Sequence, residues 1–593
     1  MYFLMKKIIQ ARSFSMLKIR NEYPRPHFRR ENWLSLNGIW EFEFDDNKDG
    51  EARGIHNGNI KLKGEINVPF TYQYAESGIG DKAHHDTMWY RKSFIYDQPG
   101  MDVILGFNAS DYITTVWING HYATTHRGGF SPFTVDISKY VTEGENTIVV
   151  RCYDPLDSTI PRGKQSWIND PWSCWYTPNS GIWQSVWIDY VGKDSIEDFS
   201  ITPDIDTNSF GGEIKLRKST ADMIEIKVFY EDKLIKRQML SPDGKYTRYT
   251  VNMMELNYVD EITYWEPEHP NLFYVDISLY RDNELLDTVH TRFGMRKISV
   301  SDDGQILLNN KPLYQRLILD QGYWKTSGLT PPSVDDIKKD ILLTKEMGFN
   351  GARKHQKFED PYYYYLADEL GLLTWCEMPS SYNFNSDEVS YVTQEWQKIV
   401  NTAKKFSSVI TYVPVNESWG IRKALTSSEQ QSFARSLYYL TKSLDSSRLV
   451  STNDGWENVS DSDILAIHDY ASLGKELKSK YNEGTYNVAF QTFRRVLANG
   501  NDYKGQPVLL SEFGGIMFER DRNNGNWGYN SAAKCDEEFF ERLKELVDGI
   551  YSADFQGFCY TQLTDVQQEV NGVLDADHNP KVDVTRLKEI FAR

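Results

Sequence analysis

The chain has 593 residues, too many for a single hydrophobic core, and this length predicts three or four domains. Its hydrophobic content of 40% and charged content of 25% are typical of a folded globular protein. The formal charge of −18 argues against nucleic acid or an anionic membrane surface as a partner, because both would repel the protein.

The N-terminal segment M-Y-F-L-M-K-K-I-I-Q-A-R lacks the features of a signal peptide. Lys6 and Lys7 interrupt its apolar residues, and it has no clear cleavage site. No stretch of the chain approaches the roughly 20 apolar residues of a membrane-spanning helix. These observations predict a cytoplasmic enzyme.

Five scattered cysteines indicate neither a disulfide framework nor a zinc site. The adjacent His84 and His85 have no further spaced ligands, so a solvated loop is the favoured interpretation of this pair. We therefore predict no metal and no cofactor. A homo-oligomer is compatible with the sequence.

The first half of the chain has the pattern of two β-sandwiches. From Trp33 onward, short alternating runs at 39–44, 88–94 and 112–118 are separated by turn residues such as Asn119-Gly120, a pattern typical of antiparallel sheets. Further runs at 224–230 and 274–280 lie within about 110 residues, the size of one immunoglobulin-like sandwich.

Beyond Leu307, apolar strands alternate with amphipathic helical stretches, which indicates βα units and a parallel sheet. The helical stretch 335–347 has an apolar stripe that includes Leu342. The expected strands number eight, enough to close a (β/α)8 barrel, and lie near 313–319, 349–354, 372–376, 409–415, 449–453, 463–467, 507–511 and 555–560.

Two of these strands end in a carboxylate. The run V-I-T-Y-V-P-V-N-E at 409–417 leads to Glu417, and P-V-L-L-S-E at 507–512 leads to Glu512. Because the C-terminal ends of barrel strands face one pocket, the two residues are expected to face each other. Paired carboxylates are what glycoside hydrolysis needs, although each alone could be an ordinary strand-end charge.

The runs N-E-S-W at 416–419 and S-E-F-G-G at 511–515 resemble the acid/base and nucleophile motifs of family 2 glycoside hydrolases. This group contains β-galactosidases, β-glucuronidases and β-mannosidases. The runs L-N-G-I-W at 36–40, V-P-F at 68–70 and G-G-F-S-P-F at 128–133 resemble its sugar-binding domain. The resemblance implies a three-domain form: a jelly-roll sandwich at 1–190, an immunoglobulin-like sandwich at 191–300 and a catalytic TIM barrel at 301–593.

The resemblance also implies roles for individual residues. Arg353 would keep a nucleophilic carboxylate ionised, and Asn416 would donate to the sugar 2-hydroxyl. His355 follows Arg353 by two positions rather than the three usual in the family, so its alternative is a structural histidine at the barrel rim. Tyr470 would orient the nucleophile, or it could be one more core aromatic.

Two further residues complete the predicted substrate-binding set. Asp170, in the run K-Q-S-W-I-N-D, would reach from the first sandwich into the barrel mouth to bind glycone hydroxyls. His468 precedes Tyr470 by two positions and is expected beside it.

The glycone is the least determined feature. The run Asn579-Pro580-Lys581 matches the N-x-K motif with which β-glucuronidases bind the substrate carboxylate, but alignment places the motif positions at 569–571. Glu569 there would repel a uronate. Thr561 replaces a tryptophan that contacts the glycone in many members.

The favoured interpretation is therefore a retaining exo-β-glycosidase with Glu512 as nucleophile and Glu417 as acid/base. β-Galactosides are the leading expectation for its carbohydrate substrate. A β-glucuronidase, a β-mannosidase and a non-catalytic carbohydrate-binding protein are the alternatives.

Overall fold

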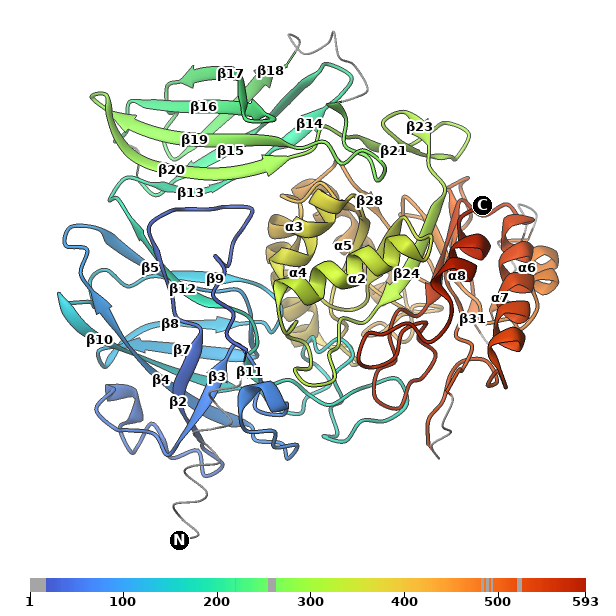
Figure 1. Cartoon of the computed structure of the whole chain (residues 1–593), viewed down its shortest axis with the longest axis horizontal. Helices are drawn as coiled ribbons and strands as arrows, with labels where there is room; N and C mark the ends of the chain where they lie inside the picture. Colours follow the sequence, from blue (N-terminus) through green and yellow to red (C-terminus); the bar gives the residue numbers. More distant parts are fainter. Residues whose placement is uncertain are drawn as a thin grey trace.

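The computed structural model of the chain describes residues 18–218, 220–253, 263–481, 485–486, 490–491, 494–519 and 525–593. The N-terminal segment discussed above lies outside them through residue 17. Two sandwiches and a barrel make up the molecule (Figure 1). Among the described residues, no helix is both long and apolar enough to cross a membrane.

The first sandwich packs a six-stranded sheet on a four-stranded one. The six-stranded sheet, in spatial order, is β3 (Gly64–Val68), β2 (Gly38–Phe44), β4 (Thr87–Tyr96), β10 (Gly144–Tyr153), β7 (Ile113–Ile118) and β8 (His121–Arg127). The other is β1 (Trp33–Ser35), β12 (Val186–Val191), β5 (Asp102–Phe107) and β9 (Phe133–Asp136), and β6 (Ser110–Asp111) pairs with β11 (Gly181–Ile182).

A two-residue turn joins β7 to β8. Asn119 and Gly120 both have positive φ, 49° and 81°, which is the geometry that matches the twist of a hairpin. The predicted turn at this position is confirmed.

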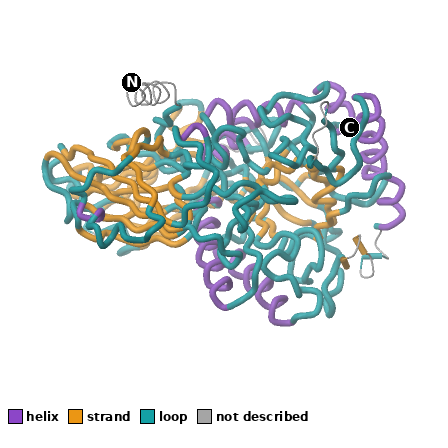
Figure 2. Tube along the Cα trace, turned by 90° about the horizontal axis from the view of Figure 1, so that it is seen from below, coloured by secondary structure: helices purple, strands orange, loops and turns teal. Residues whose placement is uncertain are grey.

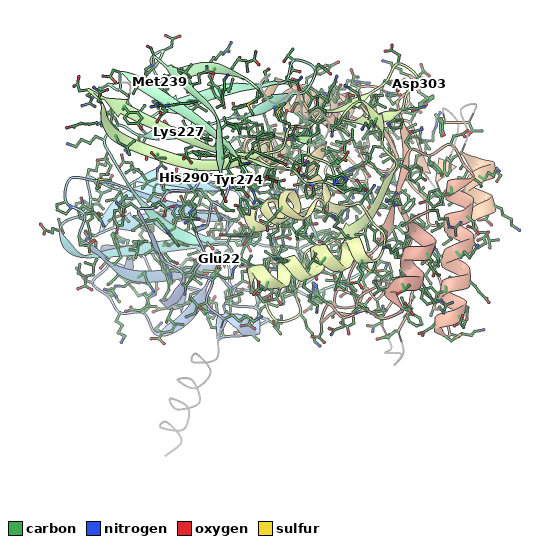
Figure 3. The ribbon with its side chains drawn as sticks, turned by 45° about the horizontal axis from the view of Figure 1, so that its top comes forward. Glu22, Lys227, Met239, Tyr274, His290 and Asp303 are labelled. Carbon is green, nitrogen blue, oxygen red and sulfur yellow. The ribbon has the colours of Figure 1, made fainter. Side chains whose placement is uncertain are left out.

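The second sandwich lies above the first in Figure 1. One of its sheets contains β13 (Ile196–Phe199), β14 (Thr202–Asp204), β15 (Ser209–Leu216) and β18 (Tyr246–Asn252); the other has the order β17 (Lys233–Leu240), β16 (Met223–Tyr230), β19 (Phe273–Arg281) and β20 (Glu284–Phe293). Figure 3 shows Lys227, Met239 and Tyr274 over this second sheet. A small sheet of β21 (Ile298–Val300), β22 (Ile306–Leu308) and β23 (Lys311–Pro312) then leads to the barrel.

Eight parallel strands form the barrel sheet, as predicted, and the helices surround them (Figure 2). In chain order the strands are β24 (Gln315–Asp320), β25 (Gly351–Lys354), β26 (Leu373–Glu377), β27 (Val409–Val413), β28 (Leu449–Val450), β29 (Leu465–His468), β32 (Val508–Gly514) and β33 (Gly557–Thr561). Strands β25, β26 and β27 are buried at every residue, as expected for parallel strands covered on both faces.

The barrel helices are α2 (Val334–Glu346), α3 (Pro361–Leu370), α4 (Ser386–Ala403), α5 (Ser428–Leu444), α6 (Gly474–Lys480), α7 (Asp536–Tyr551) and α8 (Val584–Phe591). The fifth βα unit has a loop at 451–464 in place of a helix, and β30 (Phe490–Gln491) pairs with β31 (Arg494–Arg495) in the loop before β32.

Helix α2 differs from the prediction in one residue of its apolar stripe. Ser333 caps its N-terminus by accepting a hydrogen bond from the backbone N–H of Asp336, and Ile337 and Ile341 are buried. Leu342 is 47% exposed, because it lies five positions after Ile337 and so falls outside the buried face.

Candidate active site

Glu417 and Glu512 approach each other at the C-terminal side of the barrel. Glu512 lies within β32, which runs three residues further than predicted, and Glu417 follows β27 by four residues. One carboxylate oxygen of Glu417, one of Glu512 and a ring nitrogen of His468 all lie within 4.8 Å of one another. The structure therefore brings the two predicted carboxylates together.

The loop after β27 holds Glu417 in an unusual backbone conformation. Glu417 and Ser418 have φ values of 53° and 56°, a left-handed region that residues other than glycine seldom adopt. The backbone N–H of Glu417 donates to the carbonyl oxygen of Asp454 (2.8 Å), and that of Ser418 donates to Oδ1 of Asn453 (3.0 Å). Neighbouring loops thus maintain a conformation that aims Glu417 at the pocket.

Arg353 organises the base of the site and is fully buried. Its Nε donates to Oε1 of Glu377 (2.6 Å), and its Nη2 donates to Oδ1 of Asn416 (3.0 Å). Its Nη1 donates to the carbonyl oxygen of Ser511 (2.6 Å) and to Oε1 of Glu512 (3.3 Å). Burial alone would lower the pKa of Arg353, but the surrounding carboxylates outweigh burial and raise it. A permanent cation therefore lies beside Glu512.

His468 joins Glu417 to the barrel interior. Its Nδ1 lies 2.9 Å from Oε1 of Glu417, and its Nε2 lies 2.7 Å from Oδ1 of Asp454. Burial would lower the pKa of His468, but attraction to Glu512, Asp454 and Glu417 raises it to about 10. In turn, burial would raise the pKa of Glu417, but the hydrogen bond and charge of His468 lower it overall.

Tyr470 and Asn416 also reach the site. The Tyr470 hydroxyl donates to Oε2 of Glu512 (2.5 Å) and lies 3.2 Å from Oγ1 of Thr561, and its ring stacks on that of Tyr529 at 3.8 Å between centroids. Asn416 is 1% exposed, and its Nδ2 has no hydrogen-bond partner. An amide donor buried without a partner is costly, which favours a ligand group that would accept from it.

His355 lies at the edge of the cluster. Its Nδ1 is 3.0 Å from Oε2 of Glu377 and 4.0 Å from Oε1 of Glu512. Its Nε2 lies 3.3 Å from Nε2 of Gln356. These contacts suit the structural alternative as well as a role in binding.

The structure does not bring Asp170 to this cluster. Asp170 is exposed on the loop that follows Ser166. Its backbone N–H donates to the Ile168 carbonyl, and its backbone carbonyl accepts from the Ser166 hydroxyl. The neighbouring Asn169 has a φ of 70°, so the chain turns before it reaches Asp170. A different residue of the same loop, Lys164, is directed inward and is 6% exposed.

Several residues of the site were not predicted to act there. Glu377 and Asp454 were not assigned roles, yet both lie against Arg353. Each follows the pattern that identified Glu417, since Glu377 ends β26 and Asp454 follows β28 by four residues.

An aromatic cluster from two domains adjoins Glu417. The Nε1 of Trp419 donates to Oε2 of Glu417 (3.2 Å), and the Trp419 ring meets that of Trp175 at 5.2 Å. The cluster contains Trp167, Trp172 and Trp175 from the first sandwich and Tyr382 and Trp419 from the barrel.

The loop after β33 contains the residues that bear on the glycone. Glu569 is 1% exposed; its Oε2 accepts from the hydroxyl of Tyr176 (2.7 Å) and its Oε1 from Nδ2 of Asn571 (3.4 Å). Burial raises the pKa of Glu569. The Nζ of Lys581 donates to both oxygens of Asp565 (2.8 and 2.9 Å), so its charge is already matched.

Among the described residues, one group of three side chains could hold a metal ion. It consists of Glu417, His468 and Glu512. Their nitrogen and oxygen donors suit a transition metal. Such an ion would occupy both carboxylates. His84 and His85 instead lie against Asp86 and Asp46, respectively, at 2.9 and 2.8 Å.

Three family models match consecutive parts of the chain. They are the sugar-binding domain of glycosyl hydrolases family 2 (residues 33–189), glycosyl hydrolases family 2 (195–296) and the TIM barrel domain of that family (298–593). The chain belongs to glycosyl hydrolase family 2, as the sequence motifs predicted, in a three-domain form.

Known proteins of the family are distant in sequence. A β-galactosidase of Thermoanaerobacter pseudethanolicus is 25% identical over 61% of this chain and 48% of its own length. A β-glucuronidase of Streptococcus agalactiae is 23% identical over 95% of this chain and 96% of its own. The chain thus spans about half the length of some curated relatives and nearly all of others.

A solved structure has the same fold throughout. The β-glucuronidase of an uncultured Clostridium species superposes with a TM-score of 0.76 at 19% identity, over 96% of this chain and 99% of the other.

Proposed function

We propose that this glycoside hydrolase is a retaining exo-β-glycosidase that acts by double displacement. The observation that carries the proposal is the approach of Glu417 and Glu512 oxygens to within 4.8 Å. Retaining enzymes hold their two carboxyl groups closer together, about 5–5.5 Å, than inverting enzymes do, about 6.5–9.5 Å, so this close approach of one oxygen from each residue favours retention.

In the first step, Glu512 attacks the anomeric carbon, and the departing oxygen takes a proton from Glu417. Arg353 and Tyr470 hold the attacking carboxylate by hydrogen bonds. In the second step, Glu417 removes a proton from water, which attacks the same carbon and releases the sugar with its original configuration.

Glu417 has to carry a proton before the first step, although its neighbours favour its ionised form. The proton donor at hand is His468, whose Nδ1 lies 2.9 Å from Oε1 of Glu417. Proton transfer from His468 would supply Glu417 as the leaving oxygen approaches, and Asp454 would stabilise the histidine.

For the glycone, the leading proposal is a neutral sugar, with galactose first. Glu569 adds a buried carboxyl group to this side of the pocket, and Lys581 is occupied by Asp565. A substrate carboxylate would therefore meet like charge. The choice of galactose among neutral sugars follows only the names of relatives such as the Thermoanaerobacter β-galactosidase.

A β-glucuronidase is the second candidate. It is favoured by the Streptococcus relative, which aligns over nearly the whole of both chains. A β-mannosidase with the same fold is a further alternative. A non-catalytic binding protein is disfavoured because both carboxylates are in place. Cytoplasmic location stays a prediction from the sequence.

A panel of p-nitrophenyl β-glycosides tests the proposal. We expect kcat/KM to be higher for the galactoside than for the glucuronide under one set of conditions, and proton NMR to detect the β-anomer as the first product. Release of the α-anomer would contradict retention, and a better glucuronide would contradict the neutral glycone.

A further inference from the structure

Lys164 is a buried cation from the first sandwich that lies at the mouth of the barrel. Its side chain belongs to a residue that is 6% exposed, and no carboxylate oxygen of the described residues lies within 4.0 Å of its Nζ. Burial would lower the pKa of Lys164, but the charges of Cys174, Glu569, Glu417 and Glu512 outweigh burial and raise it. Burying an ammonium group without a close counter-ion is costly, so this position requires an explanation.

The loop that holds Lys164 is fixed to the barrel. The backbone N–H groups of Arg162 and Gly163 both donate to the carbonyl oxygen of Ser380, at 2.9 and 3.0 Å. Gly163 has a φ of 58°, and a Cβ atom there would lie 2.3 Å from the carbonyl oxygen of Gln356. Only glycine allows this close approach, which carries Lys164 over the pocket.

The backbone of Lys164 is also hydrogen-bonded to the segment that follows the loop. The N–H of Tyr176 donates to the carbonyl oxygen of Lys164 (2.8 Å), and the N–H of Ser166 donates to that of Tyr176 (2.8 Å). The Lys164 Nζ lies 6.0 Å from the ring centroid of Trp175 and 5.9 Å from that of Tyr176. The ammonium group thus lies near both rings.

The same two rings connect Lys164 to the reacting groups. The Tyr176 hydroxyl donates to Glu569, and Trp175 packs on Trp419, which donates to Glu417. Among the electrostatic attractions on Glu569, that of Lys164 is the largest. Both groups therefore lie around Tyr176: the Lys164 Nζ is 5.9 Å from its ring centroid, Glu569 accepts from its hydroxyl, and Lys164 and Glu569 form no ion pair with each other.

We propose that Lys164 and Glu569 together bind one hydroxyl group of the glycone. The hydroxyl oxygen would accept from the Lys164 ammonium group, and its hydrogen would be donated to Glu569. A hydroxyl satisfies both partners without adding charge, whereas a carboxylate would add a negative group beside Glu569, Glu417 and Glu512. Lys164 then contributes to selectivity for a neutral sugar.

This inference rests on the proposed function, and the experiment separates the two. Wild-type activity with retention on the glycoside panel decides the function. To test the inference, kcat/KM on p-nitrophenyl β-galactoside and β-glucuronide is measured for three variants. These are Lys164→Met, Glu569→Gln and the double variant. Lys139→Met, an exposed lysine of the same sandwich, is the matched control.

We expect each single variant to lose about 10- to 100-fold in kcat/KM on the galactoside, the loss typical of a hydrogen bond to a charged group. The double variant should be little worse than either single one, because both act on one hydroxyl. Lys164→Arg should recover part of the activity, and Lys139→Met should match wild type.

Three outcomes would overturn the inference. They are single variants that keep galactoside kcat/KM within about twofold of wild type, additive losses in the double variant, and a Lys164→Met loss confined to the glucuronide. Calorimetric titration of free galactose into wild type and Lys164→Met gives a second readout that does not depend on turnover or on the anomeric outcome. Weaker binding to a variant with an unchanged melting temperature would support the proposal, and equal binding, or no binding to wild type, would overturn it.

Discussion

The hydroxyl of Tyr470 donates a 2.5 Å hydrogen bond to Oε2 of Glu512, and the same hydroxyl lies 3.2 Å from Thr561. Together with Arg353 on Oε1, this bond fixes both oxygens of Glu512. In the proposed mechanism, these contacts would set the direction of attack before substrate arrives.

Replacement of Tyr470 by phenylalanine should remove this orientation. We expect kcat to fall about 100-fold with little change in KM, since loss of one preorganised donor has effects of this size. Tyr529→Phe keeps the ring that stacks on Tyr470 and serves as the control. A raised KM with unchanged kcat would assign Tyr470 to ground-state binding instead.

The roles of the two carboxylates can be separated with azide. Glu512→Ala should abolish turnover of every glycoside, because no nucleophile remains. Glu417→Ala should still cleave aryl glycosides whose leaving group needs no proton, and azide should then give the β-glycosyl azide. Formation of the α-azide from the Glu417 variant would exchange the two assignments.

The unpaired Nδ2 of Asn416 provides a test at the sugar 2-hydroxyl. Asn416→Ala should lower kcat/KM about 100-fold on a galactoside, because the interaction with this hydroxyl strengthens in the transition state. The matched 2-deoxygalactoside lacks the acceptor, so its kcat/KM should change much less. Equal losses on both substrates would show that Asn416 acts through Arg353 rather than through the sugar.

Replacement of His468 should shift the pH profile of kcat/KM. The hydrogen bond and charge of His468 lower the pKa of Glu417 against the effect of burial. His468, whose pKa is raised to about 10, holds the proton that it would pass to Glu417. His468→Asn removes this proton source, so the alkaline limb of kcat/KM should move to lower pH, from loss of the His468 proton to loss of the Glu417 proton. An unmoved limb, or movement to higher pH, would contradict the assignment.

Glu395 should make the stability of the protein, rather than its activity, depend on pH. It lies on α4, its Oε1 accepts from the backbone N–H of Phe130 in the first sandwich (2.7 Å), and burial raises its pKa from 4.5 to about 7. The folded state therefore binds this proton more tightly than the unfolded state does. Stability should fall as pH rises from 4.5 to 7, by about 2–3 kcal/mol.

Glu395→Gln should remove that part of the pH dependence. The measurement is the denaturation midpoint of wild type and variant between pH 4.5 and 8, with exposed Glu429→Gln as the control. If wild type and Glu395→Gln keep parallel curves across this range, Glu395 does not titrate as described.

The sequence predicted the features that depend on local pattern. Buried apolar runs place β27 and β32, and the residues at their C-terminal ends lead directly to Glu417 and Glu512. The family resemblance added Arg353, Asn416 and Tyr470, and all three contact the two carboxylates or one another.

The sequence did not predict features that depend on loop conformation. Asp170 was expected in the pocket, but the loop is set by the left-handed Gly163 and by contacts with the barrel, which direct Lys164 inward instead. Likewise, the position of Asp454 beside Arg353 and His468 depends on the path of the loop after β28, which no local pattern encodes.

The close contact of Gly163 with Gln356 also limits how such enzymes can be rebuilt. Under the proposed function, an isolated barrel would keep Glu417 and Glu512 yet lose Lys164 and Trp175, so its site would be incomplete even if it folded. Chimeras between relatives should therefore exchange the first sandwich and the barrel as a single unit. A variant such as Gly163→Val, whose larger side chain would separate the first sandwich from the barrel, should lose activity as an isolated barrel would.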